Sequence, residues 1–258
     1  MFYVQNALAD NPAPLQITLI PRTWSVRRCA ADRRCIQQQI SQIDKITLKC
    51  KKYKFLSGLI CIFLIAELFL TAEVFMEFAN ALIERFYRND PELRMLLLTH
   101  SMQVRDKAMD IAETVDMELD WDLLNRGALL HDIGIIKCHA PDIHCHGKLP
   151  YIAHGTAGAE MLREVSGELE GCARICMRHT GSGLTAQEIA AGKLPLPEMD
   201  LLPETPEEKL ICLADKFFSK SGKMEEKPLR QIRRSMEKFG PDSLARFDEL
   251  CRIFNIPV

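Results

Sequence analysis

The stretch GALLHDIG, residues 127–134, decides both the fold class and the kind of site to expect. An apolar run without a breaker leads into a His-Asp pair, which indicates a buried helix that ends at His131 and Asp132. Adjacent side chains diverge on a regular helix, but at a helix end, with Gly134 loosening the backbone, both can turn toward one point. Imidazole and carboxylate groups are suitable ligands for zinc, manganese or iron, so the stretch predicts part of a metal site.

Three more polar residues lie on the apolar stripes of predicted helices. His100, His179 and Asp215 each follow apolar residues three and four positions earlier, so their side chains are expected to face the core. A single buried histidine is more often a hydrogen-bonded core residue than a ligand, and a lone buried carboxylate is costly. Several such groups on different helices are explained together if they bind one divalent cation.

The spacing of apolar residues predicts an all-α fold over residues 73–258. Proline and capping residues mark several helix starts, most clearly in Thr205-Pro206-Glu207-Glu208. The segment between the His-Asp pair and Tyr151 is predicted to be a loop, and no convincing strand is found apart from short apolar runs near residues 15–20. The expected helices cover residues 73–87, 92–115, 121–131, 154–165, 169–179, 206–219, 228–239 and 241–254.

Residues 1–72 are predicted to be an irregular or single-helix N-terminal extension. Residues 1–54 carry ten Lys and Arg against three Asp, a net charge of +7. Because the whole chain has a net charge of −2, the rest of the chain carries −9. The apolar stretch 55–70 is short of the roughly 20 apolar residues that a membrane span needs. Three interpretations stay open for this region: a weak membrane segment, a packed helix, or an extension foreign to the native protein, whose natural start would be Met76. The last is favoured because regular patterning begins only near residue 72.

The overall composition is ordinary for a globular protein, with 47% hydrophobic and 26% charged residues. The net charge of −2 argues against stable nucleic-acid binding. The ten cysteines follow no disulfide framework, so a reducing, cytoplasmic setting is expected. The oligomeric state is left open.

Several motifs together resemble the HD superfamily of metal-dependent phosphohydrolases. LTHSMQV (98–104), GALLHDIG and ICLADKF (211–217) carry the pattern H…HD…D, matched by His100, His131-Asp132 and Asp215. The stretches HGTAGAEML, RHTGSGLT and LPETPEEKLICLADKFFSKS are similar to a bacterial and archaeal subgroup of HDIG proteins described as predicted hydrolases. The resemblance covers roughly residues 90–220. It implies an HD-type helical bundle that holds a divalent metal ion (Mn, Fe, Zn, Co or Ni).

The resemblance also bears on the number of metal ions, one or two per chain. In two-metal members, additional histidines lie between the HD pair and the last Asp, and His154 and His179 match them. Asp132 would then bridge the two ions. Members with the fullest metal shell have two adjacent histidines where this chain has His179-Thr180, which puts the second ion in doubt.

The activity that the resemblance implies is hydrolysis of a phosphate ester, a nucleotide or a related small phosphate compound, by metal-activated water. His131 and Asp132 would act at the metal. Lys137 and Arg178 are candidates for stabilising the developing charge and, with Lys216, for binding substrate. His144 and His146, in the loop before Tyr151, are expected to contact the substrate.

Two other functions stay open. One is a non-catalytic HD module that binds a nucleotide and signals to partners; an intact ligand set disfavours it. The other is an oxygenase with a di-iron centre. The glycine-tyrosine-proline motif of HD-type cyclic-di-GMP phosphodiesterases is missing, which disfavours that substrate. The spacing of the Cys and His residues in 138–146 fits no standard zinc finger.

Overall fold

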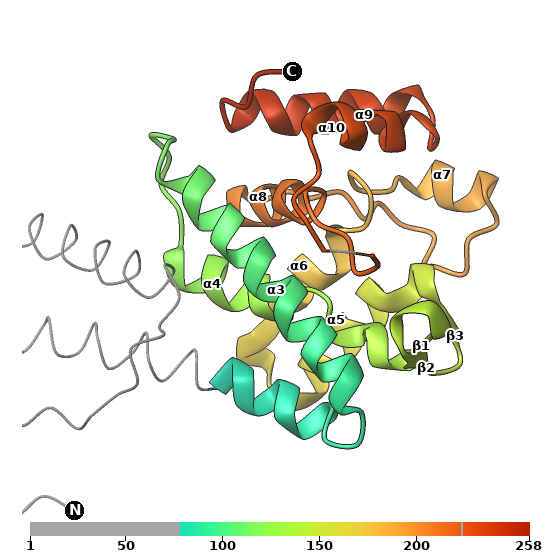
Figure 1. Ribbon diagram of the computed structural model, residues 1–258. Coiled ribbons are helices and arrows are strands. Elements are labelled where there is room, and N and C mark those ends of the chain that lie inside the picture. The colour runs from blue at the N-terminus through green and yellow to red at the C-terminus, as the bar shows by residue number, and fades with distance from the viewer. Residues whose placement is uncertain (1–77, 223) are drawn as a thin grey trace, which may run out of the picture.

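The computed structural model describes residues 78–222 and 224–258, and these residues are mainly helical (Figure 1). The all-α prediction is therefore confirmed for this part of the chain. The predicted N-terminal extension and its apolar stretch 55–70 lie outside the described residues. After a helical stretch at 78–86, the α-helices are α3 (Pro91–Ala112), α4 (Trp121–Leu130), α5 (His154–Val165), α6 (Glu170–Arg178), α7 (Ala186–Ala191), α8 (Pro206–Asp215), α9 (Leu229–Glu237) and α10 (Pro241–Ile253).

Capping side chains fix the starts of two of the helices that end at predicted ligands, α4 and α8. The Asp120 carboxylate accepts hydrogen bonds from the backbone N–H groups of Asp122 and Leu123 at the start of α4. Thr205 and Glu208 form a capping box at the start of α8, as predicted from the sequence. A cap of this kind contributes about 1 kcal/mol and favours a helix start at this residue.

Two hydrophobic clusters form the core of the described part of the chain. One joins α3, α4, α8, α9 and α10, and the other joins residues 78–87, α3, α4, α5 and α6. Helix α3 crosses both: Leu97 belongs to the second cluster and Val104 to the first, and the buried His100 lies between them. The polar site described below therefore lies where the two clusters meet.

The loop predicted before Tyr151 is instead a small sheet, so the absence of strands was wrongly predicted here. Strand β1 (Cys138–Ala140) pairs antiparallel with β2 (Cys145–His146) and parallel with β3 (Leu149–Pro150). Between β1 and β2, His144 adopts a left-handed backbone with φ 60°. Strands of two or three residues are too short to show the alternation by which strands are recognised.

The connections around these elements are short 3-10 turns: η1 (Ile133–Lys137), η2 (Pro141–Ile143), η3 (Tyr151–Ala153) and η4 (Gly167–Leu169). Among residues 78–222 and 224–258, no helix has the length and apolar character needed to cross a membrane.

Candidate metal centre

The His-Asp pair lies at the end of α4, where the chain changes from α-helix to the 3-10 turn η1. His131 is still helical, whereas Asp132 has φ −108° and ψ 11°, and the two side chains turn to the same side. Gly134 is needed here for a different reason from the one predicted. A Cβ at this position would lie 2.1 Å from the backbone oxygen of His154 and 2.3 Å from the nitrogen of Gly158, so the glycine lets η1 pack directly on α5.

Four side chains from three helices meet at this point. The ligand atoms of His100, His131, Asp132 and Asp215 all lie within 4.8 Å of one another, and all four residues are buried. His100 Nε2 lies 3.1 Å from Asp132 Oδ2 and 3.0 Å from Asp215 Oδ1. His131 Nε2 lies 3.0 Å from Asp132 Oδ2 and 3.6 Å from Asp215 Oδ1. The structure thus brings together the whole set that was predicted from the H…HD…D pattern.

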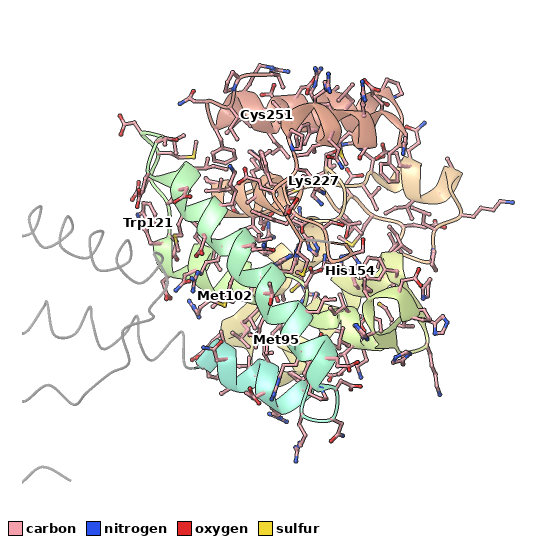
Figure 2. All side chains as sticks on the ribbon, in the orientation of Figure 1. Met95, Met102, Trp121, His154, Lys227 and Cys251 are labelled. Carbon is pink, nitrogen blue, oxygen red and sulfur yellow. The ribbon has the colours of Figure 1, made fainter. Side chains whose placement is uncertain are left out.

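A second cluster shares Asp132 with the first. His154, at the start of α5, and His179, directly after α6, each place Nε2 at 3.4 Å from Asp132 Oδ1. The two Nε2 atoms lie 3.0 Å from each other. His154 is seen in the interior of the helical assembly in Figure 2. The two oxygens of Asp132 therefore face different clusters, one on each side.

Backbone carbonyl groups fix how three of the imidazole rings are turned. Nδ1 of His131, His154 and His179 lies 2.7, 2.7 and 2.8 Å from the carbonyl oxygen three residues earlier in the chain. A carbonyl oxygen only accepts, so each Nδ1 carries a proton, and in the neutral ring each Nε2 directs its lone pair into the cluster. This is the tautomer that a metal-binding histidine needs.

The two clusters contain more hydrogen-bond acceptors than donors. Whether a metal ion fits the site can be judged from these acceptor atoms. Asp132 Oδ1 is buried and makes no hydrogen bond. Asp132 Oδ2 is buried too, and the groups near it are Lys220 Nζ and the rings of His100 and His131. The facing lone pairs of His154 and His179 would repel each other unless a cation or a proton lies between them. A divalent cation meets all these needs at once, and imidazole and carboxylate groups are donors that it prefers. The residues present fit one or two ions with Asp132 shared.

The protonation behaviour of the side chains reflects the same excess of acceptors. Burial opposes the charge of Asp132, but Lys220 and His131 outweigh it and hold the pKa of Asp132 well below its usual range. Burial would lower the pKa of His131, yet Asp132 and Asp215 raise it to about 9. For His154 burial dominates and lowers the pKa to about 3, so this ring is neutral. The charge of Lys220 and the proton on His131 thus offset part of the negative charge of the buried carboxylates.

Two lysines supply positive charge at the cluster, and sequence reasoning found only one of them. Lys216 Nζ lies 2.5 Å from Asp215 Oδ2 and donates to the His179 carbonyl oxygen at 3.2 Å. Lys220, which was missed, has Nζ 2.5 Å from Asp132 Oδ2 and 4.0 Å from Asp215 Oδ1. Helical spacing could not have pointed to it, because Lys220 lies in the irregular segment that follows the end of α8 at Asp215.

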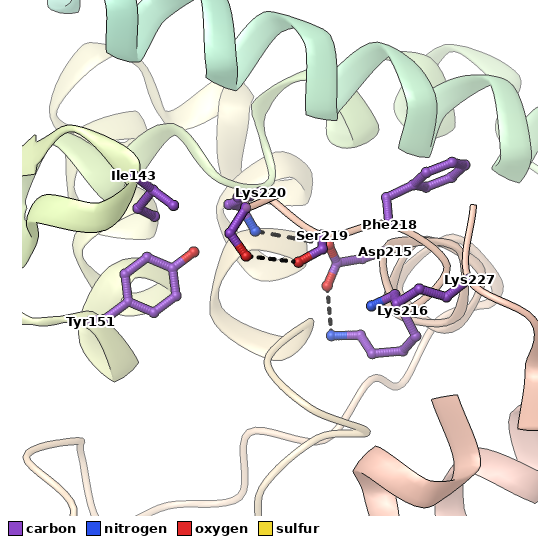
Figure 3. A pocket seen from close by; sticks show the side chains of 9 residues that line it. Ile143, Tyr151, Asp215, Lys216, Phe218, Ser219, Lys220 and Lys227 are labelled. Carbon is purple, nitrogen blue, oxygen red and sulfur yellow. Dashed lines mark hydrogen bonds and ion pairs between the residues drawn. The ribbon is translucent and has the colours of Figure 1, made fainter. Parts of the chain in front are cut away.

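A cavity of about 310 Å³ opens beside Asp215 (Figure 3). Its wall combines three lysines and two serines with two aromatic rings. The cavity therefore offers cations and hydroxyl donors next to the metal cluster, with apolar surface at its sides. The lining residues are Ile143, Tyr151, Asp215, Lys216, Phe218, Ser219, Lys220, Ser221 and Lys227.

The other side chains predicted to bind substrate lie elsewhere. Lys137, His144 and His146 are exposed and are absent from the lining of the cavity, and His144 Nδ1 lies 3.2 Å from Glu92 instead. The guanidinium of Arg178 donates to the Leu202 carbonyl oxygen at 2.6 Å and pairs with Glu204 at 2.6 Å. Arg178 therefore holds the segment before α8, and the small sheet contributes Ile143 rather than its histidines.

The family follows from this geometry and from comparison with known proteins. Residues 97–219 match the HD domain family. With the two His/Asp clusters, this match shows that the chain carries an HD domain with a metal-binding cluster typical of HD phosphohydrolases. The resemblance found in the sequence is thereby confirmed.

Three curated proteins are similar to part of this chain. The chain is 37% identical over 125 residues to an uncharacterized protein of Methanocaldococcus jannaschii, covering 47% of this chain and 66% of that protein. It is 39% identical over 124 residues to the tRNA (cytidine(56)-2'-O)-methyltransferase of Picrophilus torridus and 30% identical over 149 residues to the protein of the same name from Thermoplasma volcanium. Those matches cover 48% and 58% of this chain but 32% and 38% of the relatives. The chain thus spans less than two thirds of the length of each relative. No solved structure matches the chain at a significant level.

Proposed function

We propose that this protein is a metal-dependent phosphohydrolase that hydrolyses a small phosphate ester, a nucleotide or a related compound. The observation that supports this most is the position of Asp215. Its carboxylate belongs to the ligand cluster and also lines the lysine-rich cavity, so a substrate in the cavity lies directly beside the metal centre.

The residues of the cluster and those of the cavity would have different roles. His100, His131, Asp132 and Asp215 would hold the ion, which supplies a Lewis acid for a phosphoryl oxygen and for water. Lys216 stands beside Asp215 and is placed to stabilise negative charge that develops on a transferred phosphoryl group.

The cavity itself favours a small anionic compound with a flat or apolar portion. Lys216, Lys220 and Lys227 supply positive charge for phosphate, and Tyr151 and Phe218 supply apolar surface against which a base can pack. A volume of about 310 Å³ is at the lower end of the range for small-molecule pockets. This supports a mononucleotide-sized substrate better than a polymer.

The metal ion is proposed to be Mn, Fe, Zn, Co or Ni, and two ions per chain are supported by the two clusters that share Asp132. The same observation favours a second candidate, an oxygenase with a di-iron centre. The names of the two methyltransferases are not extended to this chain, because the match covers about a third of each.

The test is a phosphate-release screen with the full-length protein over nucleotides and cyclic dinucleotides, after metal removal and with each metal added back. We expect release by the wild type and a loss of more than about 100-fold in Asp132→Asn, because that carboxylate serves both clusters. Asp116→Asn, an exposed carboxylate after α3, is the matched control and should behave as wild type.

Three outcomes would contradict the proposal. Release that persists in Asp132→Asn would mean that the activity arises elsewhere. Oxygen consumption with two irons per chain, and no phosphate release, would favour the oxygenase. Nucleotide binding without release under any metal would favour a non-catalytic module.

A further inference from the structure

Lys220 and a metal ion would compete for the same carboxylate oxygen. Lys220 Nζ lies 2.5 Å from Asp132 Oδ2. That oxygen is also the one at 3.1 Å from His100 Nε2 and 3.0 Å from His131 Nε2, which makes it the centre of the four-residue cluster. An ion held by this cluster would bind the oxygen at about 2.0–2.2 Å. A dication and an ammonium group that both contact one carboxylate oxygen repel each other strongly in a buried site.

The side chain of Lys220 is held in place by charge. Its side chain is 12% exposed, and its ammonium lies between Tyr151 and Asp215 (Figure 3). Burial lowers the pKa of Lys220, but Asp132 and Asp215 outweigh this and raise it above its ordinary value. The lysine thus acts as the counter-ion of two buried carboxylates, and a metal ion would remove the need for it.

The local backbone allows Lys220 to move. The residue lies in the irregular segment that follows α8, where Ser221 and Gly222 are exposed and Gly222 has φ 74°. The ammonium can therefore change position without the unwinding of a helix. Its nearest alternative is the cavity that it already lines, together with Lys216 and Lys227.

We propose that Lys220 is a tethered cation which occupies Asp132 Oδ2 in the metal-free protein and, when a metal ion binds, swings into the cavity to contact the phosphate of the substrate. The inference has two parts. The substrate half, contact of Lys220 with the phosphate, rests on the proposed function, whereas the metal half, displacement of Lys220 by the ion, does not. Binding of the metal would complete a phosphate site of three lysines, so the protein would take up its substrate only in the metal-loaded form.

The first experiment is a titration of the metal-free, full-length protein with Mn²⁺. Lys220→Met keeps the length of the side chain and removes the charge, and we expect it to bind Mn²⁺ about tenfold more tightly than wild type, within the usual range of coupling between two sites. Lys238→Met, an exposed lysine directly after α9, is the matched control and should leave Mn²⁺ affinity unchanged. Equal or weaker affinity in folded Lys220→Met would overturn the proposal.

Lys220→Met leaves two carboxylates without their counter-ion. If this variant does not fold, a measurement on the wild type takes its place. Reductive methylation followed by mass spectrometry reports how accessible each lysine is. We expect methylation of Lys220 to rise several-fold when Zn²⁺ is added, while that of Lys238 stays constant. Unchanged protection of Lys220 in the zinc-loaded protein would refute the displacement.

The substrate half is tested with inorganic phosphate. The Mn²⁺-loaded wild type should bind phosphate about tenfold more tightly than Mn²⁺-loaded Lys220→Met, and equal affinities would refute this half. The outcomes separate the two proposals. Failure of the phosphohydrolase proposal would show as no phosphate release from any substrate, with the Mn²⁺ difference intact. Failure of this inference would show as unchanged Mn²⁺ affinity in a protein that still releases phosphate.

Discussion

Replacement of Gly134 by alanine should damage both the stability of the protein and its second metal cluster. The added Cβ would lie 2.1 Å from the His154 backbone oxygen and 2.3 Å from the Gly158 nitrogen, well inside van der Waals contact. These are backbone atoms of α5, so no side chain can rotate to make room, and α5 must move as a body. Overpacking of a core costs about 1–3 kcal/mol, and we expect this position at the upper end.

Urea unfolding of the metal-free protein measures this cost, and Gly167→Ala is the matched control. A Cβ on Gly167 would meet nothing within 4 Å, so that variant should be neutral or more stable by about 0.4–1 kcal/mol. Since α5 begins at His154, Gly134→Ala should also weaken metal binding at the cluster of Asp132, His154 and His179. A Gly134→Ala protein within about 0.5 kcal/mol of wild type would refute the close-packing argument.

The remaining predictions concern ionisable side chains. The metal-free protein should lose stability as the pH rises from about 6.5 toward about 9, because the pKa of His131 is raised to about 9 in the folded state and its charged form is the stabilising one. It should also lose stability as the pH falls below about 6.5, because folding holds His154 neutral with a pKa of about 3. The free energy of unfolding, measured with a chelator present over this pH range, should therefore be highest near pH 6.5. Arg178→Lys should lower the free energy of unfolding by about 1–3 kcal/mol and leave metal content unchanged, since Arg178 bonds the Leu202 carbonyl oxygen and Glu204 rather than the ligands; a loss of metal by elemental analysis would contradict this reading.

The ligand set was predictable because it breaks the pattern of its surroundings. His100, His179 and Asp215 are polar residues at apolar positions of helices, and helical spacing alone places them toward the core. That all of them meet the His-Asp pair follows from the family pattern, which fixes how the helices pack. The helix starts were readable for the same local reason, since a capping box is contained within four residues.

Lys220 and the cavity were not readable in this way. A lysine is usually solvated, and only the departure of the chain from helical geometry after α8 brings Lys220 back onto Asp132. The role of Gly134 was also misread, because a close approach between η1 and α5 is a tertiary contact that local sequence does not encode. Helix α7 was overlooked although Thr185 and Glu188 form a capping box at its start.

The hydrogen bonds of the histidine rings have a consequence for how such a protein can diversify. Three of the rings are oriented by carbonyl groups only three positions back in the chain, so the aim of each imidazole is encoded within its own turn of backbone. The side chains of the cavity wall, such as Ile143, Phe218 and Lys227, take no part in that orientation. New substrates can therefore be accommodated by rebuilding the cavity wall, while the ion-holding chemistry is inherited intact.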